Sequence, residues 1–115
     1  MNRYTLYCTE GQTKKALELG APIKVTKRLA PLVNRKYITD LNNYTATIIP
    51  TAEQMILWLD EQKINVHINM CMNGECSWYI VVPDYYVSSV YTCISRKEAI
   101  LVAIDAALDY LSKKK

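Results

Sequence analysis

Apolar residues recur at helical spacing in three stretches of the chain. The clearest is 96–112, and weaker ones cover 52–62 and 10–19, the last ending at Gly20, a residue suited to the left-handed end of a helix. The apolar stripe of 96–112 consists of Ile100, Ala103, Ile104, Ala107, Leu108 and Leu111. Each stretch follows a Thr or Ser with Glu or Gln three residues later, the pattern of an N-terminal capping box. These pairs are Thr9 with Gln12, Thr51 with Gln54, and Ser95 with Glu98.

Alternating apolar residues predict three strands between the second and third helices, at 64–72, 76–82 and 87–94. Asn73 and Gly74 separate the first two strands and favour a two-residue hairpin turn, because both positions of that turn need positive φ. Such a turn fixes the register of the two strands. The predicted pairs are Met72 with Glu75, Cys71 with Cys76, Asn69 with Trp78, His67 with Ile80, and Asn65 with Val82.

The first 50 residues are less regular. Strand candidates at 4–8, 23–25 and 44–49 accompany the first helix, and one Pro and three Asn in 26–43 predict a long irregular loop. The length of 115 residues is that of one domain. We therefore predict a single α+β domain over 1–115. It has an N-terminal β-α unit in 1–50 and an α-β-β-β-α core in 51–112, with an antiparallel sheet and helices packed mainly on one face.

One face of the predicted sheet is too apolar to be left in water, and it is the candidate protein-binding surface. Its members are His67, Asn69, Trp78, Ile80, Val82 and Tyr91. The chain's own first 50 residues, a second copy of the chain or a ligand can cover it. The predicted function is a small non-catalytic interaction module that associates with itself, as a dimer or other homo-oligomer, or with another protein.

Composition and cysteine spacing narrow the class of protein. Half of the residues are hydrophobic and 22% are charged, as in ordinary globular domains. No apolar run approaches the roughly 18 residues of a membrane span, and no signal segment follows Met1, so we expect a cytoplasmic protein without a membrane partner. The spacing of the cysteines at 8, 71, 76 and 93 does not match a zinc site. We expect reduced thiols, no metal and no other cofactor.

Catalytic motifs are missing from the sequence. The single histidine, His67, is four residues from Cys71 on one strand, roughly 13 Å away and too far for a Cys–His pair. Phosphate-binding glycine loops and the GxSxG and HExxH motifs do not occur. We therefore predict no catalytic residues and a protein that is not an enzyme.

Positive charge is concentrated in the first half of the chain. Residues 1–50 hold eight Lys and Arg against three Asp and Glu, whereas 51–115 hold six against eight. The basic residues of the 24–36 segment are Lys24, Lys27, Arg28, Arg35 and Lys36. Such a cluster can sit on phosphates, so a nucleic-acid-binding accessory protein is the alternative function. The pI of 8.6 is modest for a nucleic-acid-binding domain and favours a solvated loop.

The α-β-β-β-α order over 51–112 resembles a double-stranded-RNA-binding domain, in which two helices cover one face of a three-stranded sheet. That family contacts RNA phosphates through a lysine-rich motif at the start of its last helix. Here the corresponding helix begins with Arg96 and Lys97, which Glu98 opposes. The motif is therefore not matched, and the resemblance implies the topology but not the RNA-binding activity.

Four stretches of the chain support a second resemblance. They are Tyr4-Thr5-Leu6-Tyr7-Cys8-Thr9, Leu19-Gly20-Ala21-Pro22-Ile23, Ala52-Glu53-Gln54 with Trp58-Leu59, and Glu98-Ala99 with Ala103-Ile104 and Ala107-Leu108. In these stretches the chain is similar to small uncharacterised proteins of gut Bacteroidetes and their phages or mobile elements. This resemblance implies a bacterial or phage origin and brings no established activity.

Overall fold

The predicted α+β class and the order of its core elements are confirmed. The computed structural model describes residues 5–27, 36–40, 45–70, 74–88, 92–93 and 95–114. The elements of these ranges are, in order, α1 (Glu10–Glu18), β1 (Val25–Lys27), β2 (Tyr37–Asp40), β3 (Thr45–Ile48), α2 (Ala52–Glu61), β4 (Asn65–Met70), β5 (Cys76–Val81), β6 (Tyr86–Ser88) and α3 (Arg96–Lys114). The strands form two antiparallel sheets, ordered β1-β3-β2 and β4-β5-β6.

Side-chain caps explain where the helices begin. Thr9 Oγ1 accepts from the backbone N–H of Gln12 at 3.1 Å, and Gln12 Oε1 accepts from the N–H of Thr9 at 3.0 Å. Thr51 and Gln54 form the same reciprocal pair at the start of α2. Ser95 Oγ accepts from the N–H of Glu98 at 3.2 Å before α3. Each bond satisfies a backbone donor that the first turn of a helix leaves free.

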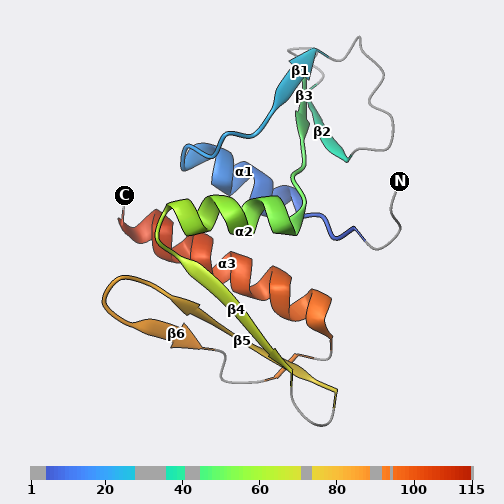
Figure 1. The fold of residues 1–115 in the computed structure, drawn as a ribbon. Helices are drawn as coiled ribbons and strands as arrows, with labels where there is room; N and C mark the ends of the chain where they lie inside the picture. The colour runs from blue at the N-terminus through green and yellow to red at the C-terminus, as the bar shows by residue number, and fades with distance from the viewer. Residues whose placement is uncertain are drawn as a thin grey trace.

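Helix α3 lies at the centre of the core. It contacts α1, α2, β4 and β5, and Figure 1 shows it between the β4-β5-β6 sheet and α1. Its buried residues are Ala99, Ala103, Ile104, Ala107, Leu108 and Leu111. The small alanine side chains allow neighbouring elements to approach closely. The helices therefore cover one face of this sheet, as predicted.

The predicted hairpin register is wrong by one residue. Because Cys76 pairs with Met70, it does not face Cys71. A shift of one residue moves every side chain of a strand to the opposite face. Trp78, Ile80 and Val82 thus lie in the core and are 9%, 0% and 3% exposed. Each such burial is worth about 1.5–3 kcal/mol, and together they outweigh the preference of one turn sequence.

The third predicted strand, 87–94, is described only in part. β6 covers Tyr86–Ser88, and Cys93 forms an isolated antiparallel bridge with Cys76. Residues 89–91 and 94 lie outside the described ranges. The prediction for these residues is therefore not tested, and the described Cys93 pairs with Cys76.

The strands of the first 50 residues lie partly elsewhere than predicted. β2 and most of β1 fall inside 26–43, so the predicted irregular loop is wrong there; residues 28–35 and 41–43 lie outside the described ranges. Tyr7 forms one bridge with Thr51 where a strand was predicted at 4–8. Figure 1 shows the β1-β3-β2 sheet extending away from the helices. The β-branched residues of β2 favour a strand, despite the Pro and Asn residues of the surrounding segment.

Candidate functional site

The residues of the predicted binding face do not share a face. Trp78, Ile80 and Val82 are buried in the core. His67 and Asn69 lie on the opposite, outer face of the sheet, and both are exposed. Tyr91 is outside the described residues. Trp78, Ile80 and Val82, which were expected to need a cover, are buried within the single chain, where α3 packs against β5.

The outer face of the β4-β5-β6 sheet combines aromatic and polar groups. The rings of His67 and Tyr79 stack with centroids 4.6 Å apart and planes 10° apart. Tyr86 meets Tyr79 edge to face, with centroids 6.5 Å apart. The polar neighbours on this face are Asn65, Asn69, Ser77 and Ser88. Polar side chains therefore lie among the three aromatic rings of this face.

The side edge of β4 carries backbone groups that point away from the sheet. In β5, Cys76 exchanges two backbone hydrogen bonds with Cys93 on the side of β6. Backbone groups alternate in direction along a strand, so His67 and its odd-numbered neighbours bond β5. Val66, Ile68 and Met70 therefore direct their N–H and C=O groups outward. No strand within the described ranges pairs with this edge.

The β4 edge lacks the features that usually protect an exposed edge. Its six residues include no charged residue, Pro or Gly. The other described edge strands are shorter, and β2 also carries the charged Asp40. On the helix-covered face Val66 and Ile68 are half-buried, and Met70 is 71% exposed. The edge therefore combines free hydrogen-bonding groups with incompletely covered apolar side chains.

Sequence reasoning placed this strand correctly but did not identify its edge as a site. The signal was present in the sequence, since Asn65-Val66-His67-Ile68-Asn69-Met70 is an alternating run without a charge. The sequence does not show that this strand lies at the side of the sheet, because central and edge strands have the same alternating pattern.

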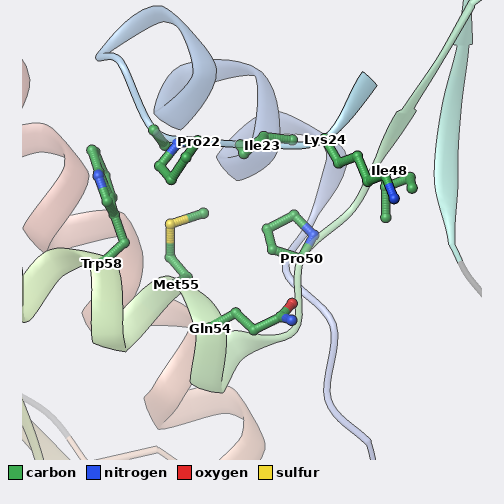
Figure 2. Close-up of a pocket in the computed structure, with 9 residues that line it drawn as sticks. Pro22, Ile23, Lys24, Ile48, Pro50, Gln54, Met55 and Trp58 are labelled. Carbon is green, nitrogen blue, oxygen red and sulfur yellow. The ribbon is translucent and has the colours of Figure 1, made fainter. Parts of the chain in front are cut away.

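A small cavity of about 300 Å³ lies where β3 leads into α2. Figure 2 shows Met55 and Trp58 of α2 opposite Pro22 and Ile23, which follow α1. Lys24 is the only charged residue of its lining, which holds no acid, His, Cys or Ser. The cavity can accept a small apolar group, but its lining supplies neither a hydroxyl or thiol nucleophile nor a carboxylate or imidazole base.

The predicted basic segment is only partly described. Lys24 is exposed at the cavity, and the Lys36 ammonium lies 5.6 Å from the centre of the Tyr7 ring, a cation–π contact. Arg28, Arg35 and the side chain of Lys27 lie outside the described parts of the structure. The proposed phosphate-binding cluster therefore stays a prediction.

The described cysteines occupy different environments. Cys8 is buried, its Sγ donates to the carbonyl of Thr51 at 3.7 Å, and burial together with the Asp105 carboxylate raises its pKa to about 12. Cys76 and Cys93 oppose each other at the end of the sheet. Among the residues that the structure describes, no group of three His, Cys, Asp or Glu could hold a metal ion.

No protein-family model, curated protein or solved structure matches the chain. Within its described part, no helix is long and apolar enough to cross a membrane. Of the features above, the β4 edge is the one that can form backbone hydrogen bonds and bury apolar side chains in the same contact.

Proposed function

We propose that this protein is a small non-catalytic interaction module that self-associates by pairing its β4 edge with β4 of a second copy. The observation that supports this proposal is the row of outward N–H and C=O groups at Val66, Ile68 and Met70. An edge of this kind is a template for another strand. Two identical edges that pair antiparallel about a two-fold axis form a closed dimer.

The strand is complementary to itself when the two-fold axis passes beside Ile68. Val66 then opposes Met70 of the partner subunit, and Ile68 opposes its own copy. Each opposed pair exchanges two backbone hydrogen bonds, so the outward groups of all three residues are satisfied. The apolar side chains meet on the helix-covered face, while His67 and Asn69 meet on the outer face. No like charges come together, because the strand carries no Lys, Arg, Asp or Glu.

The size of the contact sets its expected strength. A single strand pair with a few side chains buries less than the roughly 1,200 Å² of a standard stable interface. Its hydrogen bonds contribute only about 0.5–1.5 kcal/mol each after exchange with water. We therefore expect a reversible dimer with a Kd in the micromolar range.

A lysine at the edge tests the proposal. Met70→Lys places a charge beside the partner strand but removes little from the core, because Met70 is 71% exposed. Leu57→Lys on α2 is the matched control, since Leu57 is 59% exposed and the charge change is the same. In sedimentation equilibrium, wild type and Leu57→Lys rise with concentration from 13.2 kDa towards twice that mass, whereas Met70→Lys remains a single chain.

Two results would contradict the proposal. One is a wild-type protein that keeps the mass of one chain up to about 1 mM, the weak limit of specific association. The other is the same dissociation constant for wild type and Met70→Lys, which would place any dimer contact elsewhere. Circular dichroism of each variant confirms that the chain is folded before masses are compared.

A further inference from the structure

Two cysteines occupy directly opposed positions at the end of the β4-β5-β6 sheet. The N–H of Cys76 donates to the carbonyl of Cys93 at 2.9 Å, and the N–H of Cys93 donates to the carbonyl of Cys76 at 2.6 Å. In a pair of this type the Cα atoms are about 5.5 Å apart, and both side chains leave the same face. Disulfides need Cα atoms roughly 4.4–6.8 Å apart. The backbone therefore holds the two residues at a separation that a disulfide can span.

The two thiols differ in access. Cys76 is 1% exposed, whereas Cys93 is half-buried, and both are free thiols. Burial raises the pKa of the Cys93 thiol, and the Glu98 carboxylate and the neighbouring Cys76 raise it further. A dissolved oxidant therefore reaches Cys93 first, and its reaction becomes faster as the pH rises, because the thiolate is the nucleophile.

The sheet also determines which thiol Cys76 meets. On its other side Cys76 pairs with Met70, so Cys71 is not opposite it. Cys8 contacts the backbone of Thr51 at the start of α2. Among the described residues, Cys93 is the only thiol that the sheet places opposite Cys76.

We propose that Cys76 and Cys93 are a redox modification site and form an intramolecular disulfide when the protein meets a small disulfide such as oxidised glutathione. The Cys93 thiolate attacks one sulfur of the reagent, forming a mixed disulfide and releasing one thiolate. The deprotonated sulfur of Cys76 then attacks the sulfur of Cys93 and releases the second. The dithiol loses two hydrogen atoms, and the small disulfide is reduced to two thiols.

The bond would tie the end of the sheet to the helix that covers it. Cys93 precedes the start of α3, at Arg96, by three residues, and Cys76 begins the central strand of the sheet. This role is independent of self-association at β4, because the cross-link requires only one chain.

The test uses the full chain equilibrated with oxidised glutathione, followed by alkylation of the remaining thiols and peptide mapping by mass spectrometry. Two of the four thiols should disappear, and the peptides containing Cys76 and Cys93 should be linked. Cys71→Ser, the matched control, should retain the link, while Cys93→Ser should lose it.

Three results would overturn the proposal. They are a link between Cys71 and Cys76, a protein that keeps four free thiols at equilibrium with excess oxidised glutathione, and a Cys71→Ser variant that no longer forms the bond. The first would restore the two-residue hairpin turn in place of the observed register. A rate that rises with pH is the expected signature of attack by Cys93.

Discussion

Two neighbouring substitutions, Ile80→Ala and Val81→Ala, test which side chains of the central strand β5 lie in the core. Ile80 is 0% exposed and lies under the helices, whereas Val81 is half-buried on the outer face. Both substitutions shorten an aliphatic, β-branched side chain in β5, so their effects on strand propensity are similar. The difference between them therefore reports which face of the strand is in the core.

The magnitude follows from burial. Ile80→Ala removes three carbon atoms, worth about 0.8 kcal/mol each in transfer, and the cavity left behind brings the total loss to about 3–4 kcal/mol. Val81→Ala should lower the stability by less than about 1 kcal/mol, because strand propensities of all residue types differ by no more than about this amount. A chain of 115 residues is typically stable by roughly 6–17 kcal/mol, so both variants should fold. At about 4 °C per kcal/mol, Ile80→Ala lowers Tm by about 12–16 °C.

Urea denaturation followed by far-UV circular dichroism measures both values. The slope of free energy against urea should be unchanged, which confirms that the midpoint shift is a change in stability. Equal losses for the two variants, or a larger loss for Val81→Ala, would refute the observed register and return Ile80 to the exposed face.

Three further predictions concern the helices and a buried thiol. The amide nitrogen of buried Gln12 donates to the Leu101 carbonyl at 2.7 Å and to Asp105 Oδ1 at 2.9 Å. Gln12→Ala should therefore lower the free energy of unfolding, measured in urea, by about 2–3 kcal/mol, and a loss below about 0.5 kcal/mol would contradict this. A hydrogen bond from Lys15 lowers the pKa of Asp109 in the folded state. The ionised Asp109 therefore stabilises the fold fully above its ordinary pKa of 3.8, and this contribution is lost as the pH falls through the lowered pKa. Asp109→Asn should remove this acid dependence, which amounts to less than about 1 kcal/mol because the ion pair is exposed. An Asp109→Asn variant whose stability falls with pH as that of the wild type does would contradict the prediction. With a pKa of about 12, Cys8 should react with iodoacetamide more slowly than Cys93 at neutral pH, and mass spectrometry showing the reverse order would be inconsistent with its burial.

The helices could be predicted from the sequence because their signals are local. The stripe of 96–112 matches α3 within two residues at either end, and the caps at Thr9 and Thr51 mark the starts of α1 and α2. A capping side chain and an apolar stripe act within a few turns of one chain segment. Tertiary contacts did not need to be known.

The hairpin register could not be taken from its turn sequence alone. The apolar set of β5, including Trp78 and Ile80, had to share a face with Val66 and Ile68 of β4, and that requirement fixes the pairing within one residue. The Asn73-Gly74 turn preference favours the other pairing. Both signals are in the sequence, but the burial of several side chains is the larger free energy.

The candidate site could be predicted only in part. The strand that contains Ile68 and Met70 was expected, but whether a strand lies at the side of a sheet depends on the order of strands. That order is set by contacts between distant segments. The uncharged β4 sequence is compatible with either position, so its free edge required the structure.

The central position of α3 has a consequence for synthesis of the protein. Helix α3 follows α1, α2, β4 and β5 in the chain and contacts all four. Gln12 and Leu101, and Lys15 and Asp109, join residues 89 and 94 positions apart. While the ribosome is still making α3, the apolar face of the sheet lacks the cover of this helix, and closing such long separations costs chain entropy. We expect the nascent chain to complete its fold only after α3 is released, and until then to be a substrate for chaperones that bind apolar strands.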